Sequence, residues 1–223
     1  MRFSFLIFFY FSSALVLILS LLGLPFKYKK FSFFINLFTK NMLIVLKLFK
    51  INIEVVNSQL AVKNGYLYAS KHQSIFETIY YNKLFHNPAY ILKKELLSIP
   101  LFGTYLKKLE MIAIDRSQGI HSLKYVNDQA LNLSKYRPII IFPEGTRTEF
   151  KLQPDLKPGI YSMYKSLNIP VVPIALNSGK FWPKNNKMKK GKIIVEFREP
   201  IPTGLGKQEF LLKLKKEINF LNH

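Results

Sequence analysis

The residues best suited to chemistry in this chain are His72 and Glu77, five positions apart in the segment SKHQSIFETI. On one continuous helix they would differ by about 500° of rotation, or roughly 140° around the axis, and would not face each other. Residues 74–77 offer a helix start, because a Ser-x-x-Glu capping box would make Ser74 the N-cap. His72 then lies in the incoming loop and can fold back toward Glu77. A histidine hydrogen-bonded to a carboxylate is a tuned general base.

Two arginines in other segments suit a phosphate group. Arg116 ends the segment IAIDR, and Arg147 ends the segment FPEGTR, which also contains Glu144, Gly145 and Thr146. Paired guanidinium groups form a planar, bidentate phosphate site. A glycine at position 145 lets backbone N–H groups approach an oxyanion or phosphate closely. A general base beside a phosphate site predicts a phosphorylated alcohol as the substrate.

Taken one at a time, these residues have simpler explanations. A lone histidine is more often a satisfied loop or core residue than a base. Glu77 could act only as a helix cap, and Arg116 could form a surface ion pair with Asp115. The functional interpretation therefore depends on whether the fold brings the segments together.

From about residue 50 onward, short apolar runs alternate with longer helical patterns. This alternation predicts an α/β fold with a mixed, partly parallel sheet flanked by helices. In such sheets the chemistry gathers beyond the carboxyl ends of the strands, where His72, Arg116 and Glu144 are expected to converge. The predicted strands are residues 53–56, 66–70, 89–92, 111–114, 138–142, 171–176 and 193–197, and the predicted helices are residues 75–85, 121–135, 159–167 and 207–221.

The composition indicates one well-packed domain of a strongly basic protein. The chain has 223 residues, no cysteine, and 33 Lys and Arg against 13 Asp and Glu, for a formal net charge of +20. The lack of cysteine excludes disulfides, thiolate metal sites and a cysteine nucleophile, and we expect neither a metal nor a cofactor. The charge favours an anionic partner, which can be nucleic acid, acidic protein or acidic lipid.

The N-terminal segment predicts a membrane anchor. Residues 3–26 are 24 consecutive residues without a charge, about 36 Å long as a helix and enough to cross roughly 30 Å of hydrocarbon. A cleaved signal peptide is the competing interpretation, but no small-x-small cleavage site follows. Lysines 27, 29 and 30 come directly after the segment, so a spanning helix would leave the rest of the chain in the cytoplasm.

Two further segments each allow two interpretations. Residues 31–50 carry Asn36, Lys40 and Lys47 along one helical stripe, which fits either an interfacial helix or a second helix buried in the domain. Residues 180–192 carry six lysines beside Trp182. That loop is either solvated or in contact with anionic headgroups, with Trp182 at the interface.

Four segments, in order, resemble the motifs of the glycerolipid acyltransferase superfamily. KHQSIFE is similar to its His-x4-Asp/Glu motif, IAIDR to the second, FPEGTR to the third and VVPIAL to the fourth. The resemblance covers about residues 50–205 and is strongest to the bacterial 1-acyl-sn-glycerol-3-phosphate acyltransferases.

The resemblance implies an enzyme that moves an acyl group from acyl-CoA or acyl carrier protein to the sn-2 hydroxyl of lysophosphatidate, making phosphatidate. Together with the N-terminal pattern, it gives a membrane anchor and interfacial helix over residues 1–50 and an acyltransferase catalytic domain over residues 51–223. It also implies an anionic membrane surface as partner, the cytoplasmic face of a bacterial-type inner membrane as location, and no nucleic acid. By this resemblance His72 is the base, Glu77 is its partner, Arg116, Glu144, Gly145, Thr146 and Arg147 bind the acceptor, and Pro173 shapes the pocket.

The chain departs from the family motifs at two positions, and two alternative functions stay open. Aspartate is the commoner acid at position 77, and the usual glycine before the second motif is replaced around Glu110. Another lyso-lipid, such as a lysophospholipid or a lyso-ornithine lipid, could be the acceptor. A membrane-tethered nucleic-acid-binding protein would need Lys and Arg interleaved with aromatics on one exposed face, and only residues 180–192 resemble such a patch.

Overall fold

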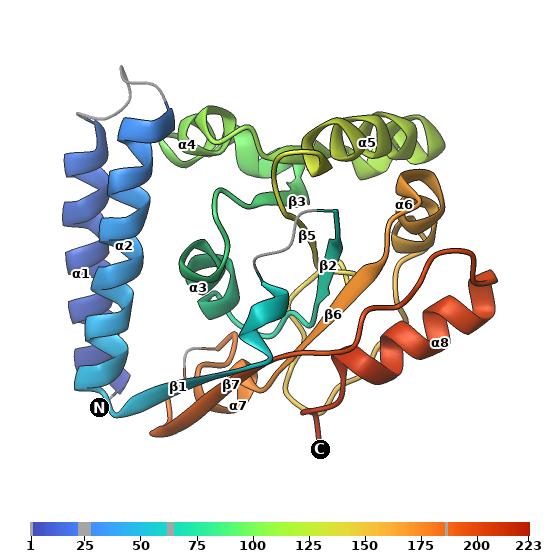
Figure 1. The fold of residues 1–223 in the computed structure, drawn as a ribbon. Helices are drawn as coiled ribbons and strands as arrows, with labels where there is room; N and C mark the ends of the chain where they lie inside the picture. The colour runs from blue at the N-terminus through green and yellow to red at the C-terminus, as the bar shows by residue number, and fades with distance from the viewer. Residues whose placement is uncertain (1, 22–27, 62–64, 186) are drawn as a thin grey trace.

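A seven-stranded sheet in the order β1-β7-β6-β2-β5-β3-β4 forms the centre of the computed structural model, which describes residues 2–21, 28–61, 65–185 and 187–223 (Figure 1). Strands β4, β3, β5, β2 and β6 run parallel, whereas β7 is antiparallel to β6 and parallel to β1. The mixed, partly parallel sheet predicted from the sequence is confirmed. The strands are β1 (Ile51–Val56), β2 (Leu67–Ser70), β3 (Ala89–Lys93), β4 (Ile112–Ile114), β5 (Ile139–Ile141), β6 (Val171–Leu176) and β7 (Gly191–Phe197).

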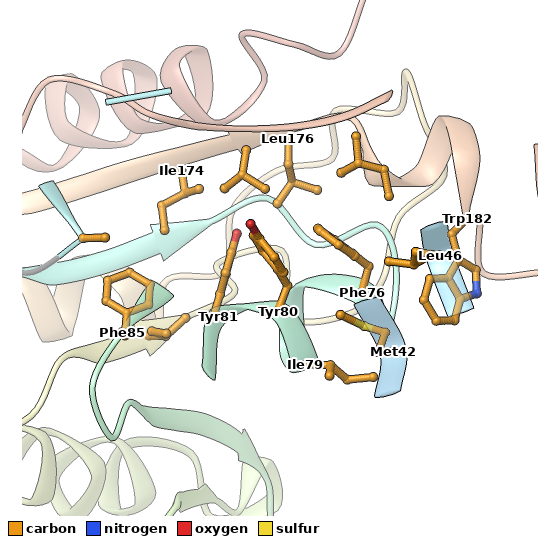
Figure 2. Packing of buried hydrophobic residues seen from close by; sticks show 14 of the residues in the cluster. Met42, Leu46, Phe76, Ile79, Tyr80, Tyr81, Phe85, Ile174, Leu176 and Trp182 are labelled. Carbon is orange, nitrogen blue, oxygen red and sulfur yellow. The ribbon is translucent and has the colours of Figure 1, made fainter. Parts of the chain in front are cut away.

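Helices cover both faces of this sheet, because alternate strand residues point to opposite sides. In β2, Tyr68 packs in a cluster with α1, α2 and α3, whereas Leu67 and Ala69 pack in a second cluster with α5, α6 and α8. Figure 2 shows Met42 of α2 lying against the side chains of α3 in the first cluster. The helices are α1 (Arg2–Ser20), α2 (Tyr28–Leu48), α3 (Phe76–Leu84), α4 (Phe102–Lys108), α5 (Gly119–Ser134), α6 (Gly159–Leu167), α7 (Ser178–Phe181) and α8 (Lys207–Ile218).

The predicted elements agree closely with these bounds. α6 and β6 have the predicted limits, and the other predicted strands and helices shift by one to three residues at an end. The sequence analysis missed α4, which has seven residues and follows Leu101, a residue with φ of 62° and no side-chain cap. So short a helix shows too few turns for a hydrophobic period to be recognised.

The membrane-spanning helix expected over residues 3–26 is not found. α1 ends at Ser20, and residues 22–26 lie outside the described part of the chain. Within residues 2–21, 28–61, 65–185 and 187–223, none of the helices combines the length and the apolar character needed to cross a bilayer.

α2 follows the buried-helix interpretation of residues 31–50. Met42, Val45 and Leu46 are fully buried in the core, while Lys40 and Lys47 are exposed on the opposite side. The helix is therefore amphipathic, with its apolar stripe held by the domain.

Trp182 is buried, so of the two interpretations of residues 180–192 the one that places Trp182 at a membrane interface is wrong. Its side chain is 2% exposed, and its ring meets Phe9 of α1 edge to face with centroids 5.1 Å apart. Figure 2 shows it next to Leu46 of α2. Trp182 therefore packs against both N-terminal helices, α1 through Phe9 and α2 through Leu46.

The backbone explains why a glycine is usual near Glu110. Glu110 has φ of 51° and comes directly after Leu109, the C-cap residue of α4. Met111 N donates to Leu106 O at 3.1 Å and Glu110 N donates to Lys107 O at 3.0 Å, which is the Schellman arrangement of a helix C-terminus. Glycine occupies this left-handed position without a steric cost.

Replacing Glu110 by glycine should therefore raise the free energy of unfolding by about 1 kcal/mol. The lost ion pair with Arg137 spans 3.4 Å and involves a glutamate that is 75% exposed, so its removal should matter little. Urea denaturation of both proteins measures the difference. A lower midpoint in the glycine variant would contradict this explanation.

Candidate active site

Three parallel strands direct the candidate residues to one edge of the sheet. His72 follows β2, Arg116 follows β4, and residues 143–147 follow β5. The carboxyl ends of parallel strands share an edge, and β2, β5, β3 and β4 are neighbours in that order. As a result, five predicted site residues line one cavity of about 1060 Å³, namely His72, Arg116, Gly145, Thr146 and Arg147.

His72 and Glu77 meet as the sequence analysis expected. His72 Nδ1 lies 3.0 Å from Glu77 Oε1, and the glutamate is completely buried. The same oxygen accepts the backbone N–H groups of Gln73 at 2.6 Å and Ser74 at 2.7 Å, while Oε2 accepts from Ser178 Oγ at 3.0 Å. A carboxylate held in this way assigns the imidazole proton to Nδ1 and leaves Nε2 as the basic nitrogen.

The start of α3 makes this contact possible. Glu77 accepts the Ser74 N–H, which is one of the two bonds of a capping box. Ser74 Oγ accepts from Phe76 N at 3.2 Å rather than from the Glu77 N–H, so the capping box expected from the sequence is present only in part. The helix itself begins at Phe76, one residue later than predicted, with Ile75 at the cap position. His72 lies outside the helix, and its ring stacks on Phe142 with centroids 4.1 Å apart.

The two arginines differ in their contacts. Arg116 is exposed, and its Nη2 donates to Gly145 O at 3.0 Å. Its neighbour Asp115 pairs with Lys94 at 3.0 Å rather than with Arg116, and hydrogen bonds from Ser117 and then Lys94 lower the pKa of Asp115. The half-buried Arg147 guanidinium makes no hydrogen bond or ion pair with any residue in the described ranges, so it is free to bind an anion.

The N–H groups around Gly145 were expected to approach an oxyanion or phosphate, and the structure agrees with this only in part. The Gly145 N–H donates to Phe142 O at 3.0 Å, so it is not free to bind an oxyanion. Gly145 has φ of +73°, and a Cβ there would lie 3.1 Å from Arg116 Nη2 and 3.2 Å from Lys157 Cγ. Glycine is therefore needed for both the turn and the close approach of Arg116.

Glu144 and Pro173 do not line the cavity, which corrects the expectation that they contact the acceptor or shape its pocket. Glu144 is 2% exposed. Its Oε1 pairs with Lys71 Nζ at 2.6 Å, and its Oε2 accepts the His72 N–H at 2.9 Å. Pro173 lies within β6 opposite Ala69. Glu144 therefore holds the loop of residues 71–75, here called the histidine loop, and does not face the cavity.

Lys71 is a site-supporting residue that the sequence analysis missed. It is completely buried, and its Nζ donates to Glu144 Oε1, to Leu152 O at 2.7 Å and to Asn219 Oδ1 at 2.8 Å. Burial lowers the pKa of Lys71, while the Glu144 carboxylate opposes that shift. In the sequence, only its position next to His72 could have indicated this role. The residue type itself gave no indication, because lysine is usually a surface residue.

The cavity is predominantly apolar away from its polar end. Among residues 2–21, 28–61, 65–185 and 187–223, no cluster of three or more His, Asp or Glu side chains could hold a metal ion. Apolar side chains that line the cavity include Val16 of α1, Phe34 and Phe38 of α2, Ile79 of α3, Phe102 and Leu106 of α4, Ile120 and Leu123 of α5, and Met163 of α6.

Comparisons with known proteins agree with this description. The family model described as Acyltransferase matches residues 52–177. A 1-acyl-sn-glycerol-3-phosphate acyltransferase of Pseudomonas aeruginosa is 41% identical over 116 residues, which cover 52% of this chain and 45% of that protein. An enzyme of the same name from Escherichia coli is 26% identical over 137 residues, 60% of this chain and 56% of the relative. The chain spans about half the length of these curated relatives.

A solved structure shows the same fold. The crystal structure of the 1-acyl-sn-glycerophosphate (LPA) acyltransferase from Thermotoga maritima superposes with a TM-score of 0.78. The match covers 99% of this chain and 95% of that one, at 17% sequence identity. The similarity therefore includes the α1–α2 hairpin as well as the sheet.

Proposed function

The chain belongs to the acyltransferase family, and from that premise we propose that it transfers an acyl group from a thioester to the sn-2 hydroxyl of lysophosphatidate, forming phosphatidate. One observation carries the proposal: a His72–Glu77 pair and an unpaired Arg147 open onto one long apolar cavity. Such a cavity suits a substrate with an acyl chain, a hydroxyl and a phosphate.

In the proposed mechanism His72 acts as the general base. Nε2 removes the proton of the sn-2 hydroxyl, and the hydroxyl oxygen attacks the carbonyl carbon of the thioester. The carbon–sulfur bond then breaks, and the thiolate takes the proton from the imidazolium. Glu77 holds the ring and stabilises its charge during the step. The chain has no cysteine to form an acyl-enzyme and no serine in a Gly-x-Ser-x-Gly segment, which favours direct transfer.

The acceptor phosphate is proposed to bind at Arg147 and Arg116. The free guanidinium of Arg147 offers a bidentate contact, and the N–H groups of Thr146 and Arg147 donate to no residue in the described ranges. Acyl-CoA or acyl carrier protein is proposed as the donor. The net charge of +20 suits either of these anionic donors.

We also propose that the enzyme works at an anionic membrane surface, the cytoplasmic face of a bacterial-type inner membrane. Residues 1–50 would attach the catalytic residues 51–223 to it. α1 exposes a row of large apolar side chains, which favours burial in a lipid interface. The most exposed are Ile7, Tyr10, Phe11, Leu15 and Ile18.

Substituting Arg147 tests the acceptor assignment. Arg147→Gln should raise the KM for lysophosphatidate by about 10- to 100-fold, because it removes charge-assisted hydrogen bonds. The KM for monoacylglycerol, which has no phosphate, should stay unchanged. Lys184→Gln in the exposed loop is the matched loss of charge and should change neither value. Equal effects of Arg147→Gln on both acceptors would show that Arg147 does not read the phosphate.

Placing alanine at position 145 should weaken acceptor binding as well. The new Cβ would press on Arg116 and Lys157, and the left-handed backbone would cost about 1–2 kcal/mol. We expect a KM for lysophosphatidate at least tenfold higher and a lower melting temperature. Steady-state kinetics and thermal unfolding measure the two effects. An unchanged KM would mean that the 145–147 turn does not hold the acceptor.

A further inference from the structure

The residues on either side of His72 are both buried and both reach the segment that follows α8. Lys71 Nζ donates to Asn219 Oδ1 at 2.8 Å, and Gln73 Nε2 donates to Asn222 Oδ1 at 2.9 Å. The exposed fractions of Asn219 and Asn222 are only 7% and 2%. These two asparagines, the asparagine pair, therefore contact the histidine loop from inside the protein.

The asparagine pair is itself fixed by further hydrogen bonds. Asn219 Nδ2 donates to Lys215 O at 2.7 Å, at the last turn of α8. Asn222 Nδ2 donates to Leu152 O at 2.9 Å, and its Oδ1 also accepts from Lys151 N at 2.7 Å. Both amides thus use donor and acceptor atoms together, so neither can rotate without losing a buried bond.

The histidine loop depends on such contacts, because residues 71–75 form no helix or strand. The His72 N–H donates to Glu144 Oε2 at 2.9 Å, and the His72 C=O accepts from Thr148 N at 2.8 Å and from Thr148 Oγ1 at 3.2 Å. Glu144 is in turn held by Lys71. A shift of Asn219 would therefore reach His72 through Lys71 and Glu144. A shift of Asn222 would reach His72 through its chain neighbour Gln73.

We propose that Asn219 and Asn222 are positioning residues that hold His72 in the geometry needed for proton transfer. The proposal rests on the proposed role of His72 as base. A catalytic group is effective only within about 0.5 Å of its productive position, and a 1 Å displacement can cost about 100-fold in rate. The pair lies about 150 positions from His72 in sequence and touches no part of the cavity lining except through the loop.

Single substitutions of the pair test this role. Asn219→Ala and Asn222→Ala should each lower kcat about tenfold or more, while the KM for lysophosphatidate changes less than twofold. Asn219→Asp keeps an acceptor for Lys71 Nζ but loses the donor to Lys215 O, so it should restore only part of the loss. Phe220→Ala is the matched control, because Phe220 lies between the two, is 44% exposed, and has the Arg198 guanidinium over its ring at 3.6 Å from the centroid. The kcat of Phe220→Ala should stay within twofold of the wild-type value.

A double substitution separates positioning from general stability. In a His72→Ala background, Asn222→Ala should cause no further loss of rate, because the group that it positions is already absent. An additional tenfold loss in that background would overturn the proposal, as would full kcat in both asparagine variants.

The position of His72 can also be measured without turnover. The chain has four histidines, and the imidazole signal that disappears in His72→Ala identifies His72 in a nitrogen-15 NMR spectrum. That signal should shift in Asn222→Ala and stay in place in Phe220→Ala. A shifted signal in an enzyme that makes no phosphatidate would refute the proposed function but support the positioning role. An unmoved signal in Asn222→Ala would refute the positioning role whatever the activity.

Discussion

Replacing His72 by alanine should lower kcat for acyl transfer by about 10²- to 10⁴-fold, the usual contribution of general-base catalysis. The fold should survive, because Glu77 keeps its bonds from Gln73, Ser74 and Ser178 when the imidazole is removed. The His72 side chain is 16% exposed, so the vacated space joins the cavity. Initial rates at saturating acceptor, together with thermal unfolding, measure both parts of the prediction.

The matched control for this experiment is His121→Ala. His121 is an exposed histidine of α5 that does not line the cavity, and its loss should leave kcat unchanged. If His72→Ala kept more than a tenth of the wild-type rate, the His72–Glu77 pair would not be the catalytic base.

Replacing Lys71 by methionine should lower the free energy of unfolding by about 3–5 kcal/mol. Methionine keeps the length of the side chain but leaves the Glu144 carboxylate buried without its charged partner, 2.6 Å away in the wild type. The carbonyl of Leu152 and the amide oxygen of Asn219 lose a donor as well. Urea denaturation monitored by circular dichroism gives the difference in stability.

Two further variants show whether the buried charge is the cause. Adding Glu144→Gln to Lys71→Met should recover part of the lost stability, since the uncompensated charge is removed. Lys94→Met breaks an ion pair between Lys94 and Asp115 in which the lysine side chain is 59% exposed, and it should have little effect. Equal losses in Lys71→Met and Lys94→Met would contradict the importance of burial.

Local patterns predicted the sheet and the pairing of His72 with Glu77. The β-branched, apolar run of β6 and the apolar period of α6 are each contained within one segment, so the limits of both elements could be predicted from the sequence. The His72–Glu77 contact is set by five neighbouring residues and one helix start, which again is local.

Contacts between distant segments could not be predicted in the same way. Lys71 has a residue type that is usually exposed, and Trp182 lies in a lysine-rich segment, yet the fold buries both. Their partners, Asn219 and Phe9, lie 148 and 173 positions away. Glu144 was assigned to the acceptor site by the resemblance of its motif, but its side chain pairs with Lys71. Only the tertiary structure supplies that direction.

The central claim is direct acyl transfer to lysophosphatidate, and a single-turnover experiment tests it most directly. The wild-type chain is mixed with an acyl thioester labelled in the acyl group, and the label is followed on protein and on lipid after lysophosphatidate is added in mixed micelles. The account predicts that labelled phosphatidate forms at once and that no label becomes covalently attached to the protein. Label on the protein, or labelling of a different lyso-lipid with no phosphatidate, would contradict it.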